Sequence, residues 1–208
     1  MNPQRLTLVT VVVAVLVVAG ILIAPRLGGS EAAALDVSGQ PAIGAADAPV
    51  TMVVFEDFRC PGCQSFELGV MPGIRRDYVD DGQVRVVYMN LPVLGPASDH
   101  VARVGECVFA QSNDAFWEMK TPLYRAQEEL ADERRALELA LTYAPGIDAA
   151  QVDACMDDAS SLEAVRADSA TATELGLRST PSVVVNGVPV ATPSADAVRA
   201  AIDAALAN

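Results

Sequence analysis

The sequence of 208 residues is short of basic side chains, with 14 Lys and Arg against 27 Asp and Glu and a formal net charge of −13. Such a surface repels phosphate backbones, which excludes nucleic acid as a partner. Histidine is nearly absent, and only four cysteines are present. No metal site is expected, because zinc needs about four such ligands, usually from two close pairs. Apolar residues recur throughout, which excludes extended disorder.

One long hydrophobic run is present at residues 6–24. As a helix it would be about 28 Å long, close to the ~30 Å hydrocarbon core of a bilayer. Arg5 precedes it, and a basic start favours a cytoplasmic N-terminus with export of the rest. We therefore predict an N-terminal transmembrane helix within residues 1–26 and a single-pass protein of the cell membrane. The alternative is a cleaved signal peptide, with small residues at 32–34 as the cleavage site and a secreted product.

The next segments predict a linker and then a strand–helix–strand unit. Residues 27–48 are rich in Gly, Ala, Pro and Ser and are expected to be a linker with little structure of its own. The β-prone runs 50–55 and 84–89 predict strands. Between them stands Cys60-Pro61-Gly62-Cys63, followed by apolar residues at helical spacing, with Pro72 expected to kink or restart the helix. The cysteines therefore lie at a helix start.

The rest of the expected domain, residues 49–208, is mostly helical. Residues 97–176 show no convincing strand and fit four or five helices. The runs 182–185 and 188–190 flank Asn186-Gly187, which predicts a hairpin with a type I′ turn. Ser194 is expected to cap a last helix over 195–206. The pattern indicates an α/β fold with an inserted helical domain.

The CxxC motif alone allows a zinc half-site, a structural disulfide or a redox dithiol. Zinc lacks a second close pair, since Cys107 and Cys155 are far apart in the sequence. A structural bridge over two residues would constrain little chain. A helix N-terminus stabilises a thiolate, which is the attacking species in disulfide exchange. The position of Cys60 and Cys63 therefore favours the redox interpretation.

Three separated motifs resemble those of the DsbA-like thioredoxin-fold thiol:disulfide oxidoreductases, of the membrane-anchored bacterial type. They are FEDFRCPGC at 55–63, AFWE at 115–118 and STPSVVVNG at 179–187. The resemblance spans about residues 40–206 and implies a thioredoxin fold with a helical insertion and no cofactor. It also implies that Cys60 is the nucleophile, that Cys63 resolves mixed disulfides, and that Pro181 is a cis-proline beside them. Thr180 would then pair with an extended substrate.

The sequence departs from the family pattern around the dithiol. Pro61 and Gly62 offer no charged side chain to the Cys60 thiolate, so Arg59 is the nearest cation in sequence, unless it is only a solvated loop charge. Val54 stands where related proteins often have a buried acid. Glu56 or Asp57 could transfer a proton to Cys63 in its place, or could cap the start of the helix.

The two remaining cysteines, Cys107 and Cys155, fall in predicted helices. They could be free buried thiols. In an oxidising compartment the even number of cysteines suggests pairing, so we predict a structural Cys107–Cys155 disulfide.

Three functions fit these observations. The first is an extracytoplasmic oxidase that forms disulfides in exported cysteine-containing proteins and is reoxidised by a membrane partner linked to quinone. The second is a membrane-tethered reductase, for example in cytochrome maturation, which runs the same chemistry backward. The third is a non-catalytic peptide-binding or chaperone module, against which the two intact cysteines argue.

Overall fold

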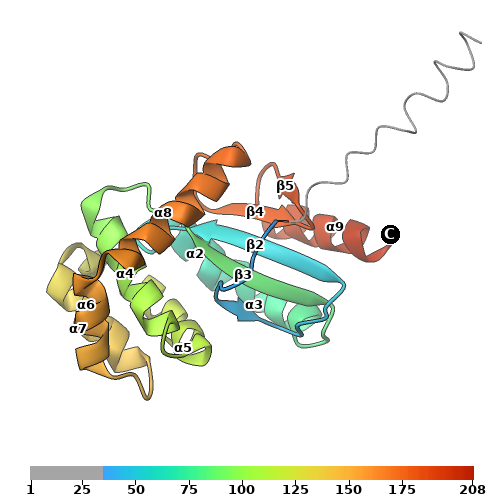
Figure 1. The fold of residues 1–208 in the computed structure, drawn as a ribbon. Helices are drawn as coiled ribbons and strands as arrows, with labels where there is room; N and C mark the ends of the chain where they lie inside the picture. Colours follow the sequence, from blue (N-terminus) through green and yellow to red (C-terminus); the bar gives the residue numbers. More distant parts are fainter. Residues whose placement is uncertain (1–34) are drawn as a thin grey trace, which may run out of the picture. The chain divides into compact units, whose positions relative to one another are not determined.

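Two valine-rich runs form the parallel centre of a five-stranded sheet in the computed structural model, which describes residues 35–208 (Figure 1). β2 (Val50–Glu56) pairs in parallel with β3 (Val84–Asn90), and the strand order is β1-β3-β2-β4-β5. Side chains alternate between the two faces of a strand. Met52 and Val54 therefore join one hydrophobic cluster, whereas Val53 and Phe55 join another.

The folded part begins earlier than the sequence predicts. β1 (Ala42–Ile43) pairs antiparallel with β3, and the Ala42 amide donates to Asn113 Oδ1 at 2.9 Å. Leu35 and Val37 pack against one face of the sheet. The prediction of a linker with little structure over 27–48 is thus wrong for residues 35–48, and the folded unit starts at Leu35 instead of residue 49. A two-residue strand is too short to show alternation, so composition alone was misleading.

The helices that follow the CxxC motif and the last helix of the chain cover the sheet face that carries Met52 and Val54. α2 (Pro61–Gly69) ends before Pro72, and α3 (Met71–Ile74) restarts there as predicted, running on into the π-helix η2 (Arg75–Val79). α9 (Ala195–Leu206) begins with the predicted cap, in which Ser194 Oγ accepts from the Ala197 amide. Ile74 and Ile202 are fully buried in this layer.

The predicted hairpin closes the other edge of the sheet. β4 (Ser182–Val185) pairs antiparallel with β2 and with β5 (Val188–Val190). Asn186 has φ 44° and Gly187 has φ 79°, as a type I′ turn requires. Pro189, which has no amide hydrogen to donate, lies in the edge strand β5.

The insertion contains five α-helices and one 3-10 helix, and residues 97–176 contain no strand. Figure 1 shows α4 to α7 grouped beside the sheet, with α8 running from this group back toward β4. Near its end, α8 contributes Ala172 to the cluster on the second face of the sheet. The helices are α4 (Pro96–Phe109), α5 (Asn113–Arg125), η3 (Gln127–Ala131), α6 (Glu133–Tyr143), α7 (Ala149–Asp157) and α8 (Ala159–Glu174).

A buried asparagine joins this insertion to the end of β3. The Asn90 backbone amide donates to Asp168 Oδ2 at 2.8 Å, and its side-chain amide donates to Glu106 Oε1 at 2.6 Å. Gln40 donates to the other oxygen of Asp168. Burial raises the pKa of Glu106 to about 7, with the charge of Asp168 adding to it, and burial raises the pKa of Asp168 to about 6. One side chain thus connects β3, α4 and α8.

The predicted anchor at 6–24 lies outside the described residues. Within residues 35–208, no helix combines the length and the apolar character needed to cross a membrane.

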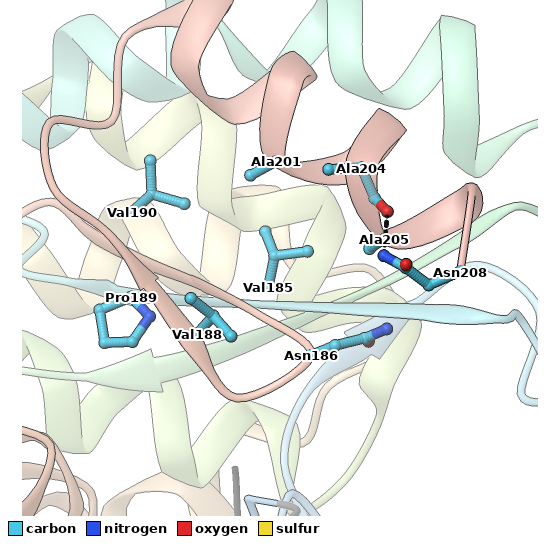
Figure 2. Close-up of a pocket in the computed structure, with 9 residues that line it drawn as sticks. All are labelled: Val185, Asn186, Val188, Pro189, Val190, Ala201, Ala204, Ala205 and Asn208. Atoms are coloured by element: carbon cyan, nitrogen blue, oxygen red, sulfur yellow. Dashed lines mark hydrogen bonds between the residues drawn. The ribbon is translucent and has the colours of Figure 1, made fainter. Parts of the chain in front are cut away.

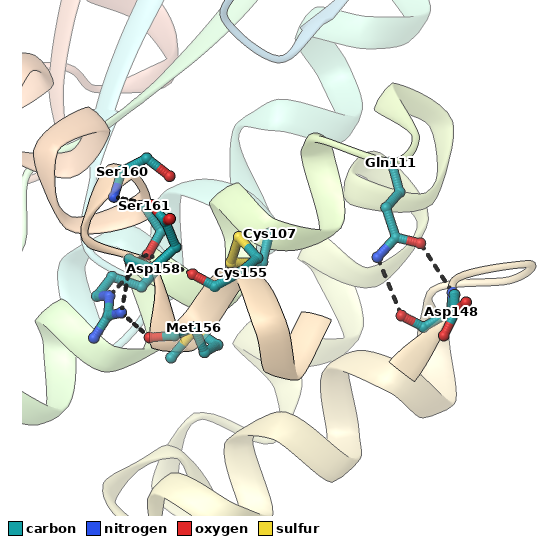
Figure 3. The surroundings of a disulfide bond; sticks show 9 residues. Cys107, Gln111, Asp148, Cys155, Met156, Asp158, Ser160 and Ser161 are labelled. Carbon is teal, nitrogen blue, oxygen red and sulfur yellow. Dashed lines mark hydrogen bonds between the residues drawn. A yellow bond between two sulfur atoms is a disulfide. The ribbon is translucent and has the colours of Figure 1, made fainter. Parts of the chain in front are cut away.

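The predicted Cys107–Cys155 disulfide is present and connects α4 to α7 (Figure 3). Cys107 is 1% exposed, and the two Cα atoms are 5.7 Å apart. Nearby, Gln111 and Asp148 exchange two hydrogen bonds, one in each direction, that also connect the end of α4 to the start of α7. Both connections lie inside the insertion.

We predict that the Cys107→Ala/Cys155→Ala variant loses about 2–4 kcal/mol of unfolding free energy. The bridge spans a sequence separation of 48 residues, for which the chain-entropy model gives about 4 kcal/mol. Urea denaturation of the variant and the wild type measures the loss, with the Cys60–Cys63 pair kept in the same redox state in both proteins. A difference below about 1 kcal/mol would contradict a stabilising role.

Candidate active site

Cys60 is placed at the start of α2 and next to the loop before β4. It is the N-cap residue, Pro61 is the first helical residue, and the Cys60 carbonyl accepts from the Gln64 amide at 3.0 Å. Its side chain is half-buried, and its thiol donates to the Thr180 carbonyl at 3.4 Å. The cysteine is therefore partly accessible, stands at the end of the helix where amides lack intrahelical partners, and touches a backbone acceptor.

Cys63 has a different environment one turn later. Its side chain is fully buried, and its sulfur accepts from the Asp57 amide at 3.5 Å. Burial raises the pKa of the Cys63 thiol far above its ordinary value, and the charge of Glu56 raises it further. Both cysteines are free thiols in this structure. The pair thus combines an accessible sulfur with one that stays protonated.

The Thr180–Pro181 bond is cis, and the loop that contains it packs against the CxxC motif. A Cβ added to Gly62 would lie 3.2 Å from Pro181 Cδ and 3.4 Å from the Thr180 carbonyl oxygen. The cis-proline and its position beside the dithiol agree with the sequence-based expectation. The close approach also gives a steric reason for a residue without a side chain at position 62.

A buried ion cluster lies beneath the dithiol. Lys120 of α5 places its Nζ 2.7 Å from Glu56 Oε2, at the end of β2, and 2.5 Å from Glu67 Oε2, in α2. All three side chains are buried. The ammonium also lies 5.1 Å from the ring centroid of Tyr124 and 5.4 Å from that of Tyr88, within the range of cation–π attraction.

The cluster is unbalanced, with two carboxylates facing one ammonium. Burial raises the pKa of Glu56 to about 7, against the opposing effect of Lys120. Burial alone would lower the pKa of Lys120, but Glu56 and Glu67 outweigh this and raise it. Lys120 therefore stays charged, and Glu56 is the member of the cluster that titrates near neutral pH.

An apolar pocket lies away from the dithiol. It has a volume of about 430 Å³ and opens between the β4–β5 hairpin and α9 (Figure 2). Its lining includes Val188, Pro189 and Ala204, and neither Cys60 nor Cys63 contributes to it. The reactive chemistry is therefore placed at the start of α2, outside this pocket.

Comparison with known proteins agrees with this geometry. The family model described as thioredoxin matches residues 36–204. The "Probable disulfide bond formation protein D" of Bacillus anthracis is 36% identical over 170 residues, which cover 80% of this chain and 78% of that protein. The chain belongs to the DsbA-like thioredoxin family. As such it is a thiol:disulfide oxidoreductase.

Two further proteins are similar to this DsbA-like chain, one in structure and one in sequence. The crystal structure of oxidised BdbD from Bacillus subtilis superposes with a TM-score of 0.74 at 26% identity, covering 83% of this chain and 95% of that one. The Na⁺/H⁺ antiporter NhaA 1 of Mycolicibacterium gilvum is 33% identical over 157 residues, which cover 73% of this chain but only 23% of the antiporter.

Asp57 and Arg59 are the remaining predicted site residues of the DsbA-like chain, and their surroundings differ. Asp57 has both oxygens occupied by backbone donors: Oδ1 accepts from the Arg59 amide, and Oδ2 accepts from the amides of Val93 and Leu94. Asp57 therefore does not cap the start of α2, which has no side-chain cap, and instead joins the loop before Cys60 to residues 93–94. The Arg59 side chain is half-buried and makes no ion pair within residues 35–208.

Sequence reasoning missed Lys120 and Glu67. Lys120 is the single lysine of the chain, and it stands among buried residues of α5, with Phe116 and Leu123 on the same helical face. Glu67 follows Cys63 by one helical turn, also on a buried face. A charged residue in register with an apolar helix face was the available signal.

We predict that Lys120→Met lowers the unfolding free energy by about 3–5 kcal/mol at pH 8, because it leaves two buried carboxylates without a cation. Lys120 lowers the pKa of Glu56 in the wild type, so its removal raises that pKa further, and stability of the variant falls more steeply than that of the wild type as pH rises from 5.5 to 8. Part of the loss should therefore be recovered at pH 5.5.

Urea denaturation at both pH values measures this effect. The double variant Lys120→Met/Glu56→Gln is the control, since it removes one of the stranded charges and should be more stable than Lys120→Met at pH 8. Equal stability of Lys120→Met at pH 5.5 and pH 8, relative to wild type, would contradict the role given to the cluster.

Proposed function

We propose that this oxidoreductase works as an extracytoplasmic oxidase, which introduces disulfides into exported cysteine-containing proteins. The observation that supports it best is the asymmetry of the dithiol, with a reachable Cys60 at a helix start and a buried Cys63. A disulfide is more oxidising when its reduced form is better stabilised, and a helix N-terminus, where Cys60 stands, is in general a favourable place for a negative charge. The disulfide-forming names of the relatives favour the same direction.

The proposed reaction starts with the Cys60–Cys63 disulfide. A client thiolate attacks Cys60 Sγ, which forms a client–Cys60 disulfide and releases Cys63 as a thiolate. The second client thiolate then attacks the client sulfur of this mixed disulfide, which forms the client disulfide and releases Cys60 as a thiolate. Two electrons pass from the client to the protein, and the two client protons are released or taken up by the new thiols.

Glu56 is proposed to carry the proton of Cys63. The Cys63 thiol has a strongly raised pKa, so its thiolate takes up a proton as it leaves. Glu56 has a pKa of about 7, and its charge acts directly on Cys63, so it can supply that proton and recover it later. Asp57 is less suited, because backbone amides occupy both of its oxygens.

The client is proposed to bind as an extended strand along Thr180 and Pro181. The Thr180 carbonyl already contacts the Cys60 sulfur. A strand that pairs with this backbone would bring its own cysteine to Cys60, with main-chain hydrogen bonds that do not depend on the client sequence. This mode suits an enzyme that accepts many unfolded clients.

The proposed location is the outer side of the cell membrane, with residues 6–24 as a single-span anchor. The Cys107–Cys155 disulfide supports an oxidising compartment. A matching segment also forms part of an antiporter, which is a membrane protein. A tether raises the effective concentration of a membrane reoxidase, for which a quinone-linked enzyme is proposed.

We predict that Cys60→Ser abolishes reoxidation of reduced, denatured ribonuclease, because it removes the sulfur that the client thiolate attacks. Cys63→Ala should also lose this activity, because it cannot form the Cys60–Cys63 disulfide. With oxidised client, its Cys60 should stay trapped in mixed disulfides, visible on non-reducing gels, because the thiol that would release it is gone. Wild-type activity in Cys60→Ser would contradict these roles. A reduction potential at or below about −270 mV, the thioredoxin value, would favour the reductase over the oxidase.

We also predict that the protein fractionates with membranes and resists carbonate extraction, because residues 6–24 stay attached. Mass spectrometry of the purified mature chain checks the N-terminus. A mature N-terminus near Leu35 would show cleavage and would replace the anchored form with a secreted one.

A further inference from the structure

Gln127 connects the helical insertion directly to the backbone of the CxxC loop. Its Nε2 lies 2.8 Å from the Phe58 carbonyl oxygen and 2.9 Å from the Cys60 carbonyl oxygen. A side-chain amide has two donor hydrogens, so one can serve each carbonyl. The residue that presents the reactive sulfur therefore has its own carbonyl held by a side chain from another part of the fold.

The position of Gln127 is set by the insertion. It is the first residue of η3, which is fixed by the fully buried Leu130. A second amide crosses the same interface in the opposite direction, since Gln64 of α2 donates to the Tyr124 carbonyl at 2.6 Å. The ring of Phe58 is stacked on that of Tyr124, with the ring centroids 5.3 Å apart. The CxxC segment is thus joined to the insertion by two side-chain amides and one aromatic contact.

This contact affects the reduced and oxidised forms of the protein differently. The Cys60 carbonyl oxygen carries a partial negative charge in the same residue as the sulfur. A hydrogen-bond donor on this oxygen weakens its repulsion of a Cys60 thiolate. The disulfide form has no charge on that sulfur, so the donor matters less to it. The amide also carries no charge, although Glu128 and Glu129 follow it in the sequence.

We propose that Gln127 is a positioning residue that stabilises the Cys60 thiolate through the Cys60 carbonyl and thereby makes the disulfide more oxidising. The inference rests on the redox dithiol of the proposed function but not on the direction of electron flow. The same shift would tune a reductase. The substitution of a residue that touches no reacting atom should therefore change the redox equilibrium.

The experiment compares Gln127→Met and Gln127→Glu with wild type in glutathione redox buffers. Methionine keeps an unbranched chain but removes both donors, and glutamate adds a negative charge beside two carbonyls. We expect the equilibrium constant to shift toward the disulfide by about threefold for Gln127→Met and about tenfold for Gln127→Glu, where tenfold is about 30 mV. Alkylation of reduced protein by iodoacetamide at pH 6 should slow in the same order.

Gln111→Met and Gln111→Glu are the matched controls. Gln111 also uses its amide on backbone groups of the insertion, but it contacts Asp148 and not the CxxC loop (Figure 3). These controls should leave the equilibrium unchanged. Thermal unfolding followed by circular dichroism checks that each variant is folded.

Equal equilibrium constants for the Gln127 variants and wild type, or equal shifts in both series, would overturn the proposal. Variants that unfold at Gln127 but not at Gln111 would also overturn it, in favour of a purely structural role. A wild-type potential in the reductase range would refute the proposed oxidase function but would leave the comparison between variants valid.

Discussion

The Lys120 ammonium is buried between carboxylates from β2 and α2, and much of the site geometry follows from this arrangement. α5 cannot move away from the thioredoxin part without exposing the interior to an unpaired charge, which is strongly unfavourable. The Lys120 ammonium also allows the carboxylates of Glu56 and Glu67 to stay buried close to the dithiol. The insertion therefore contributes a charged residue to the active site as well as helices that pack beside it.

The two cysteines acquire different chemistry from very small differences in position. Cys60 lies before the first helical turn, where its sulfur meets a carbonyl and solvent. Cys63 is three residues later, and its sulfur is enclosed and next to a carboxylate. Desolvation and a neighbouring negative charge both favour its neutral form. A single turn of helix thus separates the sulfur that exchanges with other thiols from the one that stays buried, without help from the side chains of Pro61 and Gly62.

Much of this fold could be predicted from local sequence signals. The Asn186-Gly187 turn, the Ser194 cap and the helix restart at Pro72 each depend on residues close to one another in the chain. The missed features depend on long-range contacts. Lys120 is 53 residues from Glu67, and Gln127 is 67 residues from Cys60. β1 was missed for another reason, since two residues carry no period, and its pairing is decided by the free edge of β3.

The Cys107–Cys155 bridge has a consequence for how the four cysteines pair. A newly made chain has four thiols, which allow three complete pairings, and only one pairing gives both a permanent bridge and an exchangeable pair. In the folded protein the two pairs differ in solvent exposure, because Cys107 is buried in the insertion while Cys60 is half-buried. The folded molecule thus carries one bridge that is closed to reagents in solution at Cys107 and one pair that can exchange.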